Sequence, residues 1–340
     1  MLLFWLGLAL TGCPIYLIFL YTIFKHRKIR VFNTSFYAFV FSAGILDIWY
    51  LVHQIVFISL PGAGFAMPFF LLYDRFWASY SLYAYFYIRT CQAAAVMTTS
   101  LNRFTCLLLP LRHDILWTRK LTVTLLLGQF ILSLPLHIPA AVQGCTLEFV
   151  PKFNNSGYLP WPVVREWHQQ KLCFALILLP PTIFISLIAL LSISLYSAML
   201  CKVFWCSKTE KTSTGRYNLA KARQERKADK DLHRSLALAA GLICFALLLN
   251  ILVFWLLLLM PKSYSVFYAL RLNLVSDFLD ALYCLMNPFV LLCFGTKLRP
   301  YFCSTFKSLL RIPTNSAGIL NAGKDQHVVN AVPQRVNNFV

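Results

Sequence analysis

Long apolar stretches recur along the chain and are separated by shorter polar segments. They lie at about residues 1–24, 33–60, 80–109, 121–143, 172–200, 235–260 and 266–294. Each is longer than the roughly 20 residues that a helix needs to cross the hydrocarbon core of a bilayer. The pattern therefore predicts an all-α integral membrane protein built as a bundle of seven transmembrane helices.

The first stretch begins at Met1, where a secretory signal peptide would also be found. A signal peptide carries its basic residues before the apolar stretch, whereas here four basic residues follow it, at positions 25, 27, 28 and 30. We interpret the stretch as the first spanning helix. Because almost no chain precedes it, the sequence leaves open whether Met1 is the true start.

Composition and charge agree with a membrane protein and add its orientation. Hydrophobic residues make up 59% of the chain and charged residues 13%, with a formal net charge of +19. Most of the 31 Lys and Arg residues follow spans one, three, five or seven, which predicts an external N-terminus and a cytoplasmic C-terminus. The positive charge then faces the lipid bilayer surface, and a nucleic-acid partner is not expected because the chain has no soluble basic domain.

The segment after span four, on the predicted outer side, carries two candidate modification sites. Asn154 begins the sequon Asn-Asn-Ser, which favours glycosylation there. Cys145 and Cys173 lie on the same side and are candidates for a disulfide bond. The eleven cysteines show no metal-ligand spacing, so no metal site is expected.

The predicted cytoplasmic segments differ in character. Residues 202–234 are strongly basic and face either lipid headgroups or an acidic partner. Apolar residues at helical spacing between 298 and 309 predict a short amphipathic helix on the inner leaflet, where Cys293 and Cys303 are either acylated or free thiols. We therefore divide the chain into a seven-transmembrane domain, 1–311, and a disordered cytoplasmic tail, 312–340.

Polar residues inside the spans form two stripes. A charge at the centre of a span costs about 2.5–3.5 kcal/mol on insertion scales, so each one calls for a partner or a role. Span two contributes Asp47, His53 and Gln54. The stripes recur every three or four residues, at Arg89, Gln92, Val96, Thr99 and Arg103 on span three, and at Asn273, Asp277, Asp280, Cys284 and Asn287 on span seven.

The opposite charges of the two stripes predict that they face each other, with Arg89 as the cation and Asp277 or Asp280 as the anion. One interpretation is a structural ion pair, and the other is a ligand cavity. The candidate ligand-binding residues are His53, Arg89, Gln92, Asp277 and Asp280.

The sequence contains no catalytic or cofactor motif, neither HExxH nor a P-loop nor Gly-x-Ser-x-Gly, so neither an enzyme nor a bound cofactor is expected. A seven-span ligand-gated channel or carrier, with an ion path along Arg89, Asp277 and Asp280, is an alternative to a receptor. An assembly or trafficking protein is a third.

Two motifs resemble those of rhodopsin-like G-protein-coupled receptors. Asn102-Arg103-Phe104 resembles the Asp-Arg-Tyr motif at the inner end of the third helix, and Asn287-Pro288-Phe289-Val290-Leu291 resembles Asn-Pro-x-x-Tyr in the seventh. The stretches FNTSFYAFVFSAGILDIWY, from Phe32, and TSLNRFTCLLLP, from Thr99, are similar to nematode serpentine chemoreceptors of the Srg superfamily, closest to its Srv and Srg families.

The resemblance implies a chemosensory receptor that binds an external small molecule and activates a heterotrimeric G protein, with arrestin as a further partner. It implies location in the plasma membrane, within a sensory cilium, and coupling through Asn102, Arg103, Asn287 and Pro288. The chain departs from the rhodopsin-like pattern where Asn102 replaces the acid and Leu291 the tyrosine. Span six also lacks the usual proline. We therefore expect a less tightly locked resting state.

Overall fold

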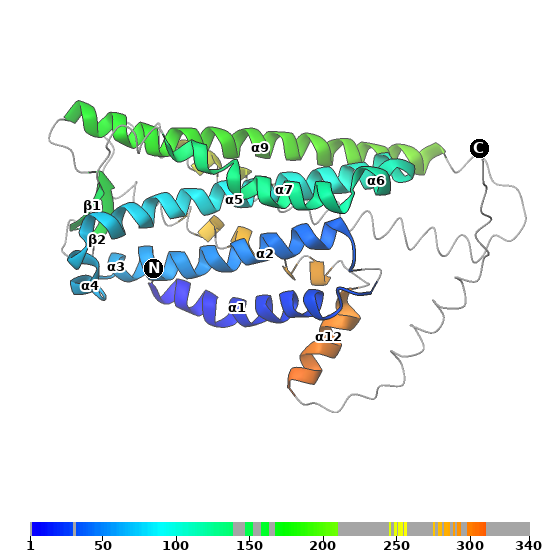
Figure 1. Ribbon diagram of the computed structural model, residues 1–340, viewed down its shortest axis with the longest axis horizontal. Coiled ribbons are helices and arrows are strands. Elements are labelled where there is room, and N and C mark those ends of the chain that lie inside the picture. Colours follow the sequence, from blue (N-terminus) through cyan, green and yellow to red (C-terminus); the bar gives the residue numbers. More distant parts are fainter. Residues whose placement is uncertain are drawn as a thin grey trace, which may run out of the picture.

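Long helices run side by side along most of the molecule in the computed structural model (Figure 1). The structure describes residues 2–29, 32–138, 147–151, 158–162, 167–209 and 298–310, and parts of 245–293. The long helices are α1 (Leu2–Lys25), α2 (Ser35–His53), α5 (Asp74–Leu108), α7 (Arg119–Ile131) and α9 (Trp167–Thr209). They correspond to the first five apolar stretches, and the scattered described residues between 245 and 293 fall within the last two.

Four helices in the described part of the chain are long and apolar enough to cross a membrane. They cover Leu2–Lys25, Ser35–Gly62, Arg119–His137 and Ala175–Met199. Helix α5 carries the polar stripe and is less apolar, yet it packs against α2, α7 and α9 and so occupies a central place. Its small residues Ala93, Ala94 and Ala95 are buried against α2 and α9, which lets neighbouring helices approach closely.

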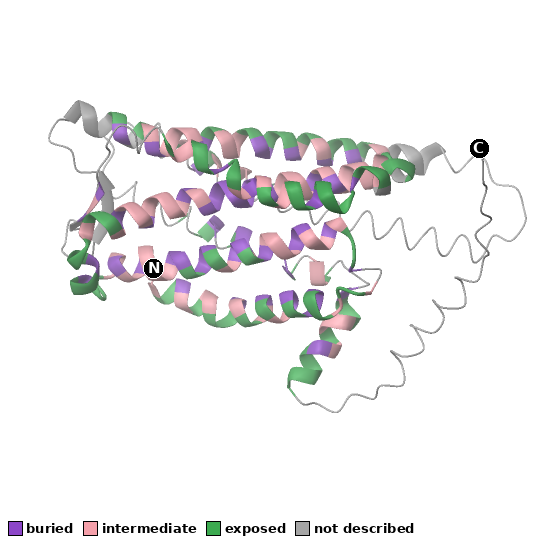
Figure 2. Cartoon of the chain, in the orientation of Figure 1, coloured by how far each residue is buried: buried purple, intermediate pink, exposed green. Residues whose placement is uncertain are grey.

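Burial divides each helix into two faces (Figure 2). Buried side chains point into the bundle, and many large apolar side chains on the opposite faces are exposed, among them Leu10 and Leu17 of α1 and Leu187 and Leu190 of α9. In a soluble protein such surfaces would be unfavourable, whereas a bilayer surrounds them with hydrocarbon. The exposed apolar faces agree with the membrane class expected from the sequence.

The second span is helical without a break over Ser35–Gly62, close to the 33–60 that the sequence predicts, but its winding changes along its length. Helix α2 ends at His53 and is followed by a π-helix, η1 (Gln54–Ser59), and by the short helices α3 (Leu60–Gly62) and α4 (Met67–Leu72). Ala66, immediately before α4, has a positive φ of 57°. Short π-helical segments such as η1 are frequent at functional sites, and η1 begins directly after the candidate ligand-binding residue His53.

An antiparallel hairpin, β1 (Leu147–Pro151) and β2 (Tyr158–Pro162), covers one end of the bundle, which we call the hairpin end. From the sequence alone, only a loop is expected there. Leu147 and Phe149 are buried in a hydrophobic cluster with residues of α4, α5 and α9. The backbone N–H of Phe149 donates a hydrogen bond of 2.7 Å to Asp74 Oδ1 at the start of α5.

Short helices lie at the opposite end, where α1 and α5 finish and α2 and α7 begin. We call it the Arg103 end. Helix α6 (Pro110–Leu116) follows α5 there, and α12 (Leu298–Leu309) runs obliquely to the bundle axis at the same end (Figure 1). The 3-10 helix η2 (Leu134–His137) follows α7 and therefore lies toward the hairpin end. Leu298 is buried against α1, and the ring centroid of Tyr301 lies 4.9 Å from that of His26. The amphipathic helix expected from the spacing of apolar residues is thus present.

Candidate functional site

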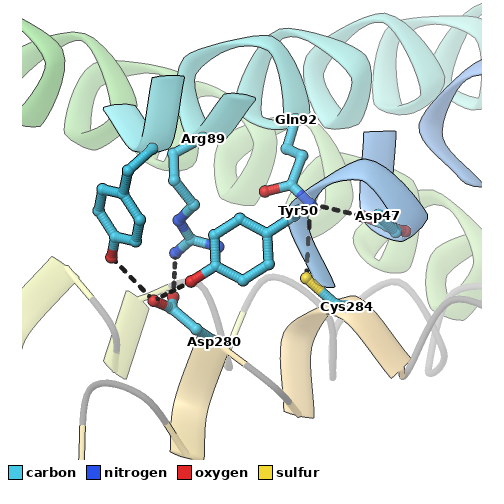
Figure 3. Close-up of polar contacts among 7 residues, drawn as sticks. Asp47, Tyr50, Arg89, Gln92, Asp280 and Cys284 are labelled. Atoms are coloured by element: carbon cyan, nitrogen blue, oxygen red, sulfur yellow. Dashed lines mark hydrogen bonds and ion pairs between the residues drawn. The ribbon is translucent and has the colours of Figure 1, made fainter. Parts of the chain in front are cut away.

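An ion pair joins α5 to the last span. The Nη2 atom of Arg89 lies 2.5 Å from Oδ1 of Asp280, and both side chains are buried, with exposed fractions of 7% and 0% (Figure 3). Of the two anions that the sequence analysis considers for Arg89, Asp280 makes this contact. Asp277 lies outside the described residues.

Aromatic side chains surround this ion pair. The hydroxyls of Tyr50 and Tyr85 donate hydrogen bonds of 2.8 Å and 3.0 Å to Oδ2 of Asp280. The guanidinium carbon of Arg89 lies 5.4 Å from the ring centroid of Tyr50 and 5.3 Å from that of Tyr283, within cation–π range. A buried ion pair is tolerated when further hydrogen bonds satisfy its oxygens, and the two tyrosines supply them.

A second buried carboxyl group lies at Asp47 of α2. It accepts a hydrogen bond from the hydroxyl of Tyr16 on α1. It also accepts one of 2.6 Å from Nε2 of Gln92 on α5 (Figure 3). Gln92 Nε2 also lies 3.4 Å from the Cys284 sulfur of the last span. Asp47 and Gln92 therefore connect four helices, and Gln92 Oε1 has no hydrogen-bond partner among the described residues.

His53 lies in a different environment, at the junction of α2 and η1. The side chain is 1% exposed, and its ring centroid lies 5.4 Å from that of Phe57 and 5.9 Å from that of Tyr80. Both ring nitrogens are buried. A buried imidazole among aromatic rings can accept or donate a hydrogen bond to a guest molecule.

The Asn102-Arg103 pair makes its contacts with the beginning of α2. Asn102 is buried, and its Nδ2 atom donates a hydrogen bond of 2.8 Å to the hydroxyl of Ser35. The guanidinium carbon of Arg103 lies 3.3 Å from the ring centroid of Phe36. No ion pair involves Arg103 within the described ranges. The bond described for the Asn102 amide thus joins α5 to α2.

The structure describes the remaining candidate residues only in part. Pro288 is buried, and Cys293 and Cys303 are exposed free thiols. Cys173 is buried and takes part in a disulfide bond. Its predicted partner, Cys145, lies outside the described residues, as do Asn154 and Asn287. No cluster of three or more metal-binding side chains occurs in the described ranges.

Sequence reasoning missed the tyrosines that complete the site. Tyr50 follows Asp47 by three residues and Tyr85 precedes Arg89 by four, so both lie on the polar faces that the stripes define. This spacing could have indicated them. Tyr16 had no such signal, because its contact with Asp47 joins two different helices.

Comparisons with known proteins agree with this architecture. A family model described as "Serpentine type 7TM GPCR chemoreceptor Srv" matches residues 5–308. A similar curated protein is "Serpentine receptor class V-1" of Caenorhabditis elegans, 28% identical over 198 residues. That alignment covers 58% of this chain, which spans about 61% of the length of the relative.

Among solved structures, the crystal structure of squid rhodopsin is similar to this fold. The TM-score is 0.60 at 14% sequence identity, and the match covers 96% of this chain and 89% of the rhodopsin chain. Together with the family match, it confirms the seven-helix membrane architecture that the apolar stretches predict. The orientation of the bundle across the membrane stays a prediction.

Proposed function

The chain belongs to the Srv family of serpentine seven-transmembrane chemoreceptors, and we propose that it binds a small external chemical and activates a heterotrimeric G protein. The observation that carries this proposal is the family match over residues 5–308, nearly the whole helical bundle. The rhodopsin-like fold supports the same class of receptor.

The ligand-binding residues of this proposal are His53, Arg89, Gln92, Asp277 and Asp280. Two of the described members, Arg89 and Asp280, form the buried ion pair, and the amide oxygen of Gln92 has no hydrogen-bond partner among the described residues. These features support a polar cavity in which a ligand exchanges hydrogen bonds with groups that otherwise bond to one another. Such a ligand can shift the equilibrium between two states of the receptor only to the extent that it binds one state more tightly than the other.

The G-protein contact of this proposal is made by Asn102 and Arg103, with Asn287 and Pro288 in the last span. Support comes from the position of Arg103 at the end of α5, where it lies on the ring of Phe36 and has no described carboxylate partner. A guanidinium held on a ring rather than in an ion pair is available to an incoming partner.

The finer parts of the proposal follow from sequence and resemblance. We place the family within the Srg superfamily and the protein in the plasma membrane of a sensory cilium, with a cytoplasmic C-terminus and arrestin as a further partner. Asn154 is the glycosylation site, Cys145 pairs with Cys173, and the exposed thiols of Cys293 and Cys303 are the candidate acylation sites. The tail after residue 311 forms no part of the seven-helix domain.

The experiment is a G-protein activation assay in cells that express the full chain, exposed to a panel of small volatile and water-soluble chemicals. We expect a concentration-dependent response that is absent in untransfected cells. Current recordings on the same cells, with G-protein signalling blocked, test the channel or carrier alternative. A ligand-evoked current that persists under the block, with no G-protein response, would refute the proposal.

A further inference from the structure

A groove runs along the outside of the bundle between α1, α2 and α7, starting at the Arg103 end. Its volume is about 970 Å³, at the upper end of the roughly 300–1,000 Å³ typical of small-molecule pockets. On α2 it extends from Ser35 to Ile45, which is about 15 Å at 1.5 Å per residue. This length is about half of a bilayer's hydrocarbon core, the depth of one leaflet.

Charge is concentrated at the mouth of the groove. Arg27 and Lys28 follow α1, Arg119 begins α7, and all three are exposed. The guanidinium carbon of Arg27 lies 3.9 Å from the ring centroid of Phe24, so the charged group rests on an aromatic ring at the mouth while the residue stays exposed. No Asp or Glu is among the described residues that line the groove.

The deeper part of the groove is apolar. Phe41 and Ile45 of α2 face Val123, Leu126 and Phe130 of α7 along its length. Between these walls and the basic mouth lie side chains that donate hydrogen bonds, including those of Asn33, Thr34 and Ser35. The lining thus changes from cationic to polar to apolar, in the order in which a phospholipid presents its headgroup, glycerol backbone and acyl chains.

We propose that this groove binds an anionic phospholipid, with its phosphate at Arg27, Lys28 and Arg119 and an acyl chain along α2 and α7. A sterol has a single hydroxyl and makes no use of three cations. The long basic segment at 202–234 is repelled by the same charges, so it is not the occupant. The predicted orientation places the basic mouth at the cytoplasmic leaflet, where anionic lipids are found.

This site is connected to the Asn102 contact. Ser35 lines the groove, and its hydroxyl accepts the hydrogen bond from Asn102. A lipid bound at the mouth therefore lies next to the segment that holds the end of α5. The binding itself requires neither the external ligand nor the G protein, so it can be tested independently of the proposed function.

The test uses the purified full-length chain in detergent micelles and a fluorescently labelled phosphatidylserine, with binding followed by anisotropy. Unlabelled phosphatidylserine should displace the probe at concentrations at which phosphatidylcholine and inorganic phosphate do not. Equal competition by phosphatidylcholine would show that the headgroup charge is not recognised. Displacement by inorganic phosphate as effective as by phosphatidylserine would show that the acyl groove plays no part. Either result would overturn the proposal.

Matched variants locate the site. The triple change Arg27→Gln, Lys28→Gln and Arg119→Gln should weaken probe binding by about tenfold or more, because each basic residue near an anionic lipid contributes to binding. The control triple Arg112→Gln, Lys120→Gln and Lys307→Gln removes the same charge from exposed residues outside the groove and should change binding less than about twofold. Equal weakening by both triples would mean diffuse surface attraction and would overturn the proposal.

A second variant probes the apolar part without a change of charge. Ala38 lines the groove, so Ala38→Trp should fill it and weaken probe binding by about tenfold while the melting temperature stays close to that of the unaltered chain. Unchanged affinity in Ala38→Trp would exclude the groove as the acyl-chain site. If the first triple variant does not fold, probe binding is compared instead between the unaltered chain and the variants Arg119→Gln and Ala38→Trp.

Discussion

The guanidinium of Arg89 lies 2.5 Å from the carboxylate of Asp280, and neither side chain is appreciably exposed. The pair connects α5, at the centre of the bundle, to the last span. A buried ion pair is often no more stabilising than apolar residues of similar volume, but removing one partner leaves an uncompensated charge and costs about 3–5 kcal/mol. Variants that remove one partner or both can therefore distinguish a structural role of the pair from a role in ligand binding.

Arg89→Met should destabilise the receptor by about 3–5 kcal/mol, because it leaves Asp280 charged and buried. The double variant Arg89→Met with Asp280→Leu should recover much of this loss. The measurement is thermal unfolding in detergent micelles. As a control, Arg75→Met breaks the Arg75–Glu148 pair, whose arginine is 75% exposed, and should cost less than about 1 kcal/mol.

The same double variant distinguishes the two roles of the pair. If Arg89 and Asp280 bind the ligand, the double variant should be folded and present at the cell surface but should no longer respond to an activating chemical. A full response at normal surface expression would assign the pair to helix packing alone and remove both residues from the proposed ligand site.

Tyr16→Phe should destabilise the bundle by about 1–3 kcal/mol, because Asp47 loses a buried hydrogen-bond donor while the ring volume is kept. Tyr21→Phe is the matched control: Tyr21 lies on the same helix but is 47% exposed, so its change should stay within about 0.5 kcal/mol. Thermal unfolding of both variants tests this. Equal effects would argue against a structural role for the hydroxyl of Tyr16.

The contact between α1 and α12 should depend on pH. Burial, with a smaller contribution from the neighbouring Lys25, lowers the pKa of His26, whose ring packs against Tyr301 and Phe32. The neutral form is therefore favoured in the folded state, and its contribution to stability is present above the ordinary pKa of about 6.5 and is lost as the pH falls through the lowered value. Acidification should thus loosen α12.

Hydrogen exchange of α12 between pH 7 and 5, corrected for the intrinsic exchange rate, measures this effect. We expect protection to fall with decreasing pH in the unaltered chain. The variant His26→Phe keeps an aromatic ring but cannot be protonated, so its protection should change little over the same range. Parallel losses in both proteins would show that another group is responsible.

The sequence was sufficient for features that are local in the chain. The apolar stretches predicted the spans, and helical spacing predicted α12 and placed Arg89 on a face opposite the acids of the last span. The hairpin of residues 147–162 was missed because its stability comes from packing of Leu147 and Phe149 onto helices distant in sequence. The change to π-helical winding at η1 was not predicted, because no proline or glycine marks its start at Gln54.

The candidate site also contains residues that the sequence identified and residues that it missed. Periodicity identified Arg89, Gln92 and Asp280, because a polar side chain within an apolar span can be recognised from the sequence alone. The donors Tyr16 and Tyr50 were not identified, since tyrosine is also common on apolar faces and its role depends on which carboxylate lies opposite.

Asn102→Asp should lower basal G-protein activation by about two- to fivefold. It places a carboxylate at the buried position 102, next to the half-buried Arg103, which has no described ion-pair partner. A two- to fivefold change corresponds to about 0.4–1 kcal/mol in favour of the state in which the pair forms. In the two-state mechanism, a pair that holds Arg103 on α5 favours the resting state. The measurement is nucleotide exchange on the G protein without ligand, normalised to surface expression.

Asn102 also donates to Ser35, so the charge effect must be separated from the loss of that bond. Ser35→Ala removes the acceptor, at a cost of about 1 kcal/mol, without adding a charge. If the new carboxylate acts through Arg103, Asn102→Asp lowers basal activation by a similar factor in the Ser35→Ala background. If Asn102→Asp lowers basal activation only in the chain that keeps Ser35, the hydrogen bond between Asn102 and Ser35 controls the resting state. Unchanged or raised basal activation in both backgrounds would contradict the idea that an ion pair with Arg103 stabilises the resting state.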